Sequence, residues 1–229
     1  MSLKNNKMPD ILYEDNHLLV LLKPAGLATM GLPEGEETLL TIAKKYIKRK
    51  YNKPHEVYLG VVSRLDVPVS GVVVFARTSK AAARLNEQFR NHTVEKIYRA
   101  IVEGKIFPAE CELVGNICED KRHRKVKLTD IDDGDEGKES RLYYCVLGRV
   151  GANSLIEVNL KTGRKHQIRA QLAAHGFPIL GDIKYGAKNK FKFAQQKNKN
   201  SCIALHAFRL SIDHPITGKR ITFEATCPF

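Results

Sequence analysis

The chain contains no apolar stretch that approaches the roughly 18 to 20 consecutive residues of a membrane-spanning helix. Residues 1–10 are polar and lack the apolar centre of a secretory signal. These two absences argue against a helical membrane protein and against a secreted one. We therefore expect a cytoplasmic protein that has no membrane partner.

The cysteines and histidines lack the spacing of a metal site. The five cysteines are an odd number, lie far apart and include no Cys-x-x-Cys pair, so we expect reduced thiols with structural roles. The eight histidines are also scattered, and none has a metal-ligand spacing to a cysteine, a carboxylate or another histidine. The sequence predicts no bound metal.

Acidic residues are scarce relative to basic ones. The chain has 38 lysines and arginines against 25 aspartates and glutamates, a formal net charge of +13. Such an excess favours a polyanionic partner, most simply a nucleic acid. An acidic membrane surface is the alternative, but the chain shows no basic amphipathic helix with large apolar anchors opposite its charge.

Short β-branched segments outnumber helical patterns in this chain. Helical spacing of apolar residues predicts helices over 38–51 and over 79–91, the second with Ser79 as its N-cap, and a third helix that ends at Gly176. Strands are predicted within 11–22, where a turn separates two of them, and over 57–62, 71–76, 96–103, 141–150, 154–161, 204–213 and 220–226.

This order of elements predicts an α+β fold, because strands and helices do not alternate strictly. We expect a mixed, mostly antiparallel central sheet with flanking helices. The charged region between residues 121 and 139 is expected to be an exposed excursion of that sheet. At 229 residues and 43% hydrophobic content, with no repeat and no obvious linker, residues 1–229 are expected to form a single domain.

Asp66 lies in a short turn-forming loop with Arg64 and Leu65. The apolar runs on either side, 57–62 and 71–76, are typical of buried strands. A loop held at both ends by the core suits a reactive group, because the scaffold fixes its position while substrate can still reach it. Asp66 is therefore a candidate catalytic residue. The alternative is an aspartate that only caps the turn, which is the simpler interpretation of an isolated Arg-Leu-Asp.

Cations are concentrated where residues 162–176 enter the third predicted helix. Arg164, Lys165 and His166 fall in its first turn, where the helix dipole disfavours a cation by a few tenths to about one kcal/mol. A bound phosphate would turn this cost into a binding site, because free backbone N–H groups also point there. The alternative is that the three side chains extend into water.

Arg169 lies on the same predicted helix beside Ile168 and Leu172, at the margin of the packed face. A guanidinium in that position stays charged and is best matched by a carboxylate. Asp66 is a candidate partner from the other loop.

Four segments of the chain, taken together, resemble the RluA-type RNA pseudouridine synthases. Each segment alone is a weak signal, but their ordered combination is specific and spans nearly the whole chain. The matching residues are Lys23-Pro24-Ala25-Gly26; Arg64-Leu65-Asp66 with Ser70-Gly71; Lys96-Ile97-Tyr98-Arg99-Ala100; and Thr162-Gly163-Arg164 with His166-Gln167-Ile168-Arg169, continuing to Pro178-Ile179-Leu180-Gly181-Asp182 and Tyr185-Gly186.

The resemblance implies a pseudouridine synthase-like fold and the conversion of a uridine in ribosomal or transfer RNA to pseudouridine, without a cofactor. Asp66 matches the family's essential aspartate, and whether it acts as nucleophile or base is left open. Tyr98 matches a tyrosine that stacks on the target base and helps in proton transfer; alone, it would suggest a sheet-core tyrosine. The remaining matches are Arg169 for the arginine paired with the aspartate, Arg64 for holding the flipped-out site open, Lys96 for RNA contact, and Ile179 and Leu180 for the apolar wall of the base pocket.

Two positions depart from the family pattern. Ser63 and Val69 stand where the family usually has histidine and threonine, which alters the hydrogen bonding of the loop around Arg64 and Asp66. The match also begins near Met1, so we expect a catalytic domain without the small S4 RNA-binding domain of many relatives. Target choice would then depend on the surface of this domain, with residues 121–127 and 188–199 as candidate RNA contacts, and we expect a monomer.

Two other functions remain open at this point. A non-catalytic RNA-binding or ribosome-assembly protein would keep the fold and the charge. A glycosidase or nucleobase hydrolase would use Asp66 on an N-glycoside and would release free uracil.

Overall fold

The computed structural model describes residues 8–33, 35–120, 125–129, 137–192 and 202–229. Its helices are α1 (Leu39–Lys50), α2 (Ser79–Arg90) and α3 (Gln167–Ala174), with a short 3-10 turn, η1 (Ile183–Tyr185). Its strands are β1 (Ile11–Glu14), β2 (Leu18–Lys23), β3 (Gly60–Val61), β4 (Ser70–Ala76), β5 (Glu95–Val102), β6 (Glu110–Asp120), β7 (Lys125–Thr129), β8 (Lys138–Val150), β9 (Asn153–Leu160), β10 (Leu205–Asp213) and β11 (Arg220–Glu224).

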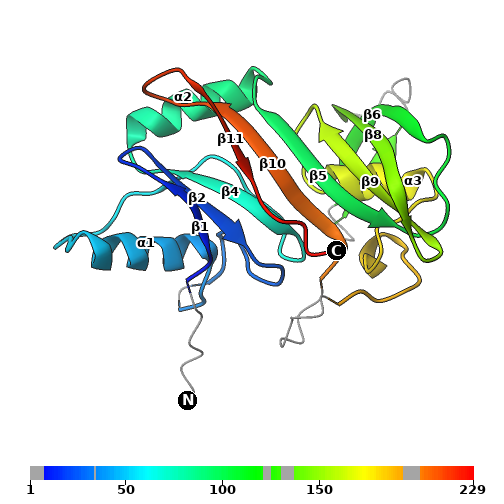
Figure 1. Ribbon diagram of the computed structural model, residues 1–229, viewed down its shortest axis with the longest axis horizontal. Coiled ribbons are helices and arrows are strands. Elements are labelled where there is room, and N and C mark those ends of the chain that lie inside the picture. Colours follow the sequence, from blue (N-terminus) through cyan, green and yellow to red (C-terminus); the bar gives the residue numbers. More distant parts are fainter. Residues whose placement is uncertain (1–7, 34, 121–124, 130–136, 193–201) are drawn as a thin grey trace, which may run out of the picture.

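Within the described residues, the strands form one eleven-stranded sheet (Figure 1). Its order is β1-β2-β4-β10-β5-β9-β8-β6-β7, with β11 added to β10 and β3 added to β4. The contact between β4 and β10 is parallel, and the other described pairings are antiparallel. The predicted α+β class with a mixed, mostly antiparallel sheet is confirmed.

Two helices cover opposite faces of the half of the sheet that contains β2 and β4 (Figure 1). Side chains alternate along a strand, so Leu19 and Leu21 of β2 pack with α1, whereas Leu18 and Val20 pack with α2. Both faces of this half are therefore buried, which explains why β2 and β4 are apolar at nearly every position.

The third helix, α3, packs on the other half of the sheet. Ile168 and Leu172 join the core cluster that includes Leu142 and Ile156 of β8 and β9. The long strands β5 and β10 run side by side through the middle of the molecule and join the two halves (Figure 1). Any site at this junction takes residues from both halves of the chain.

A close backbone approach fixes the start of β4 against β10. Gly71 pairs with Ala207, and a Cβ on Gly71 would lie 2.3 Å from the Ala207 carbonyl oxygen. Gly71 also has a φ of +127°, which other residues rarely adopt. The loop that carries Asp66 is thus held close to the junction of β10 and β5.

Several sequence-based boundaries were wrong. The predicted strand over 57–62 is reduced to Gly60–Val61, and the preceding Tyr58 is 51% exposed, so this segment is not a buried strand. The N-cap of α2 is Thr78, whose hydroxyl accepts from the Ala81 N–H, and not Ser79. Strands β6 and β7 were not predicted, because β7 falls in the charged region that was expected to be an exposed excursion and β6 carries charges at both of its ends.

In the part of the chain that the structure describes, no helix has both the length and the apolar character that crossing a membrane requires.

Candidate active site

The loop between β3 and β4 presents Asp66 at the junction of the two halves of the sheet. The Val69 N–H donates to the Asp66 carbonyl oxygen at 3.1 Å, which closes a tight turn. The Asp66 side chain remains 28% exposed. The carboxylate is therefore held in place and is open to a substrate.

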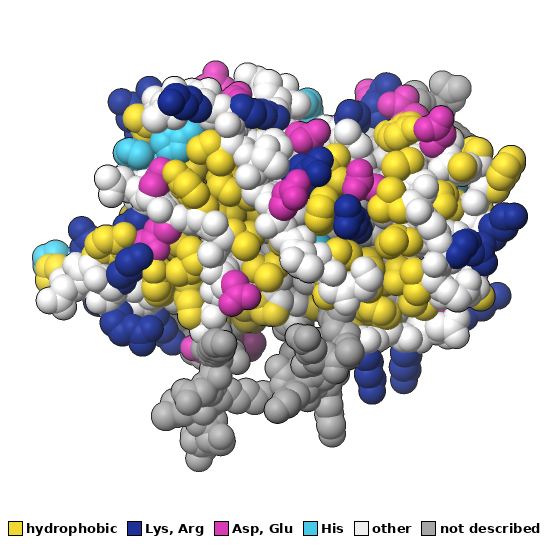
Figure 2. All heavy atoms as spheres, in the orientation of Figure 1, with side chains coloured by type: hydrophobic (Ala, Val, Ile, Leu, Met, Phe, Trp, Pro, Cys, Tyr) yellow, Lys and Arg dark blue, Asp and Glu magenta, His cyan; other side chains and the backbone are white. Residues whose placement is uncertain are grey.

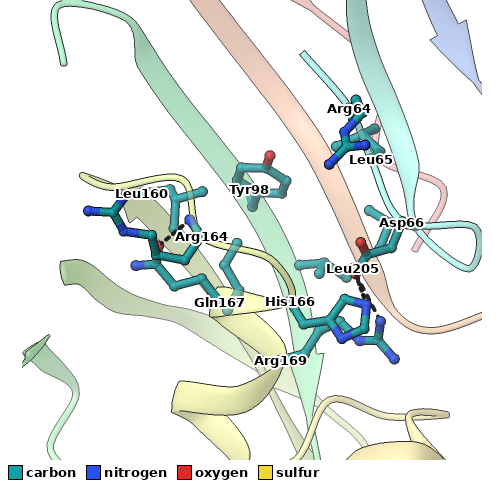
Figure 3. Close-up of a pocket in the computed structure, with 12 residues that line it drawn as sticks. Arg64, Leu65, Asp66, Tyr98, Leu160, Arg164, His166, Gln167, Arg169 and Leu205 are labelled. Carbon is teal, nitrogen blue, oxygen red and sulfur yellow. Dashed lines mark hydrogen bonds and ion pairs between the residues drawn. The ribbon is translucent and has the colours of Figure 1, made fainter. Parts of the chain in front are cut away.

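A pocket opens beside this carboxylate, and with its open mouth it holds about 390 Å³ of empty space. Tyr98 of β5 lies between the Asp66 loop and the segment that carries Leu160 and Arg164 (Figure 3). The pocket combines an apolar lining with convergent charged groups, as small-ligand sites commonly do. Its lining residues are Arg64, Leu65, Asp66, Val69, Tyr98, Leu160, Arg164, His166, Gln167, Ile168, Arg169 and Leu205.

Arg169 projects from α3 and binds two carboxylates. Its Nη1 donates to Asp66 Oδ2 at 2.8 Å, as the sequence analysis expected. Its Nε and Nη2 donate to the two oxygens of Asp182 at 2.7 and 2.9 Å. Burial alone would lower the pKa of Arg169, but Asp182 and Asp66 outweigh burial and the net shift is upward. Arg169 therefore stays charged and fixes the position of the Asp66 carboxylate.

His166 and Tyr185 complete the surroundings of this ion pair. His166 precedes α3 with a φ of +52°, and its Nδ1 lies 2.8 Å from the Tyr185 hydroxyl oxygen. Its Nε2 lies 3.6 Å from Asp66 Oδ2. Burial lowers the pKa of His166, and the charge of Asp66 partly opposes this shift. The Tyr185 ring contacts the Arg169 guanidinium, with the guanidinium carbon 4.9 Å from the ring centroid.

Tyr98 presents its ring and hydroxyl to the pocket from β5. Burial, and then the negative charge of Asp66, raise the pKa of Tyr98, so its hydroxyl stays protonated at neutral pH. Among the residues that the structure describes, none hydrogen-bonds to this hydroxyl. The Tyr98 hydroxyl is therefore available to a ligand as a donor or an acceptor.

The residues predicted to contact RNA differ in how they lie relative to the pocket. Arg64 and Arg164 line it, whereas Lys165 is exposed outside it and pairs with Glu119 at 3.1 Å. Lys96 is partly buried and donates to the Thr162 carbonyl oxygen at 3.2 Å. Burial and the charge of Arg164 lower the pKa of Lys96 to about 8.

Comparison with known proteins shows the family to which this chain belongs. The family model described as RNA pseudouridylate synthase matches residues 17–174. This chain belongs to that family. Its members are isomerases, and Asp66, Tyr98 and Arg169 all lie within the matched segment.

Individual relatives cover most of this pseudouridine synthase. It is 35% identical to the Haemophilus influenzae "Dual-specificity RNA pseudouridine synthase RluA" over 96% of this chain and 94% of that protein. It is 34% identical to "Ribosomal large subunit pseudouridine synthase C" of Buchnera aphidicola over 97% of this chain and 68% of that protein. A solved human structure, "RNA Pseudouridylate Synthase Domain Containing 4", superposes with a TM-score of 0.78 at 27% identity, covering 95% and 88% of the two chains.

The residues expected to form the apolar wall of the pocket lie elsewhere in the structure. The apolar wall of this synthase does not come from Ile179 and Leu180, because neither lines the pocket. Ile179 is fully buried and bridges to Val102, and the Leu180 backbone bonds to Ile101 and Ala204, so this segment is part of the core behind the site. The apolar wall consists of Leu65, Val69, Leu160, Ile168 and Leu205.

The cations before α3 do not occupy its first turn. The helix begins at Gln167, and the Gln167 side-chain oxygen accepts from the Arg164 N–H at 3.0 Å. In the described part of the chain, no side chain caps the helix, and the Gln167 N–H donates to the Arg164 carbonyl oxygen at 3.2 Å. Of the predicted surface contacts, residues 121–124 and 193–199 lie outside the described residues.

The two departures from the family pattern have different surroundings. Ser63 does not line the pocket, and its hydroxyl lies against the Val74 backbone, 3.3 Å from the nitrogen and 3.5 Å from the oxygen. Val69 is 3% exposed, lines the pocket and packs in the core. Of these two positions, only Val69 contacts the space where a ligand would bind.

Sequence reasoning gave no role to Asp182 or Tyr185. Both residues fall within the fourth resembling segment, but the sequence does not show that they contact Arg169. They follow the end of the family match at residue 174, and they contact Arg169 only because the chain turns back after α3. After pairing with Asp66, a buried Arg169 would still have two free donor groups. This was the available signal in the sequence for a second carboxylate.

Proposed function

We propose that this synthase converts uridine to pseudouridine in ribosomal or transfer RNA, with Asp66 as the catalytic residue. The observation that carries the proposal is the Asp66 carboxylate, fixed by Arg169 at 2.8 Å and open to a pocket that also contains Tyr98. The names of the relatives support an RNA substrate, since one acts on the ribosomal large subunit and another has dual specificity.

The reaction breaks the bond between ribose C1′ and uracil N1 and forms a bond between C1′ and C5. The hydrogen on C5 is released to solvent, and N1 gains a proton, so no oxidant, reductant or co-substrate is required. Asp66 acts at the ribose, as nucleophile or as base. Tyr98 contacts the detached base and assists proton transfer, while the apolar wall keeps water away from C1′.

The target nucleotide must leave the RNA stack to reach this pocket, at a cost of a few kcal/mol. Arg64, Arg164 and His166 line the pocket, and together with Lys96 and Lys165 they offset that cost through phosphate contacts. On the face that Figure 2 shows, Asp and Glu side chains lie next to Lys and Arg across the centre. Among the partly exposed arginines, Arg99 pairs with Glu157 at 3.5 Å and Arg209 with Glu224 at 2.6 Å, so these two arginines are less available to a phosphate.

One assay separates the three candidate functions. RNA carrying tritium at C5 of uridine is incubated with wild type, with Asp66→Asn and with the control Asp213→Asn, which changes an exposed aspartate paired with Arg220. We expect wild type and Asp213→Asn to release tritium and form pseudouridine without free uracil, and Asp66→Asn to do neither. Free uracil would indicate a hydrolase, and RNA binding without any product would indicate a non-catalytic binding protein.

The continuous sheet also supports one catalytic domain that acts as a monomer. Strands β5 and β10 connect the two halves through shared ladders, and the pocket is built within one chain. Light scattering coupled to size-exclusion chromatography is expected to give a mass near 25.8 kDa. A dimer mass would contradict this part of the proposal.

A further inference from the structure

The segment between β2 and α1 contacts both residues that flank Asp66. Leu65 precedes Asp66 and Val67 follows it, and neither belongs to a strand or helix. Residues 23–29 hydrogen-bond to the backbone of both neighbours. The position of the Asp66 backbone is thus set from both sides by a part of the chain that lies far from it in sequence.

Thr29 makes the contact on the Leu65 side. Its hydroxyl donates to the Leu65 carbonyl oxygen at 3.0 Å and accepts from the Leu65 N–H at 3.1 Å. One hydroxyl therefore satisfies both backbone groups of a single residue, as an adjacent strand would. Only a hydroxyl of this size can donate and accept at that place. Thr29 is 4% exposed and does not line the pocket, so it does not reach the substrate.

Lys23 and Gly26 make the contact on the Val67 side. The Lys23 side chain is fully buried, which is rare for lysine, and its Nζ donates to the carbonyl oxygens of Pro24, Leu27 and Val67 at 3.0, 2.6 and 3.3 Å. The Gly26 N–H donates to the same Val67 oxygen at 2.7 Å.

The segment that makes these contacts is itself anchored in rigid structure. Lys23 is the last residue of β2, which is buried against β4. The carbonyl oxygens of Ala28 and Thr29 accept from Leu39 and Leu40 in the first turn of α1, at 2.8 and 3.1 Å. A loop fixed at both ends is suited to hold a second loop to within a fraction of an ångström.

We infer that Thr29 and Lys23 are positioning residues for pseudouridine formation, because their hydrogen bonds to Leu65 and Val67 hold the Asp66 carboxylate at the distance that the reaction requires. This inference rests on the proposed catalytic role of Asp66. Displacing a reacting group by about 1 Å reduces the rate roughly 100-fold. The effect falls on the chemical step and leaves RNA affinity unchanged, since neither side chain lines the pocket.

The test compares Thr29→Val, which removes the hydroxyl at nearly constant volume, with Thr29→Ser, which keeps it. Single-turnover tritium release and the Kd for the same RNA are measured for each. We expect Thr29→Val to slow the chemical step about 10- to 100-fold with an unchanged Kd, and Thr29→Ser to restore most of the rate. Lys23→Met is expected to behave like Thr29→Val.

Thr78→Val is the matched control. It removes a threonine hydroxyl that caps α2, far from the pocket, so it reduces stability without moving Asp66. Its rate per folded molecule is expected to equal that of wild type. If Thr29→Val also keeps the wild-type rate, or if Thr29→Ser loses as much as Thr29→Val, the inference is wrong. Activity that survives in Asp66→Asn would instead overturn the proposed function.

Discussion

Asp182 holds Arg169 through two hydrogen bonds, from Nε and Nη2, and leaves Nη1 to reach Asp66. Asp182 is 1% exposed and Arg169 is 5% exposed, so water cannot replace either partner. The orientation of the Asp66 carboxylate therefore depends on an acid that lies outside the pocket.

Replacing Asp182 with asparagine is expected to destabilise the protein and to reduce its activity. The change leaves a buried guanidinium with one carboxylate fewer, which costs about 3–5 kcal/mol of unfolding free energy. Urea denaturation measures this loss. The control is Glu224→Gln, which breaks the partly exposed pair with Arg209 and is expected to cost less than about 1 kcal/mol. Equal losses in the two variants would contradict the role given to Asp182.

Removing the Tyr98 hydroxyl tests its role in the reaction separately from the packing of the Tyr98 ring. Tyr98→Phe keeps the ring, and the lost hydroxyl has no hydrogen-bond partner among the described residues, so we expect unchanged stability and unchanged RNA affinity. Pseudouridine formation is expected to slow by about 10²- to 10⁴-fold, the usual range for a lost proton-transfer group. A Tyr98→Phe variant with the wild-type rate would show that the ring alone is needed.

Lys23 is expected to make stability increase with pH. Burial lowers its pKa from 10.5 to about 7, with the charge of Asp66 opposing the shift. Between these two pH values the unfolded chain keeps a proton that the folded chain releases, so a higher pH favours the folded state. The unfolding free energy of wild type should rise more steeply than that of Lys23→Met from pH 7 to 9. Parallel curves would show that Lys23 is not the group responsible.

Arg164 and Lys165 are expected to contribute to the salt dependence of RNA binding. Arg164→Ala and Lys165→Ala should each weaken binding and reduce the slope of log K against log salt by about 1. Lys80→Ala removes an exposed charge on α2 and serves as the control, with an unchanged slope. Filter binding between 50 and 200 mM salt, about the range where such slopes are resolved, measures all three. A variant whose slope equals that of wild type makes no phosphate contact at that residue.

The sequence alone predicted the fold class and the central ion pair, because both depend on strong local signals. Asp66 stood out between two apolar runs, and Arg169 beside apolar neighbours required an acid. Asp182 was not found as the second carboxylate that binds Arg169. Their contact depends on the turn after α3, and no periodic pattern in the sequence predicts that turn. Strands β6 and β7 were missed because the charges at both ends of β6 and along β7 resemble an exposed loop, although the backbone there is regular. Whether Asp66 is catalytic stays a prediction until its variant is assayed.

The place of β10 between β4 and β5 also affects when the enzyme becomes active during synthesis. The Asp66 loop leads into β4 and Tyr98 lies in β5. Within the described residues the sheet joins these two strands through β10, more than 100 residues after Tyr98 along the chain. A nascent chain that has not yet released residues up to Asp213 from the ribosome lacks this connecting strand, and such long-range pairing forms slowly. The pocket is therefore completed late, and incomplete chains are expected to be inactive towards the RNA around them.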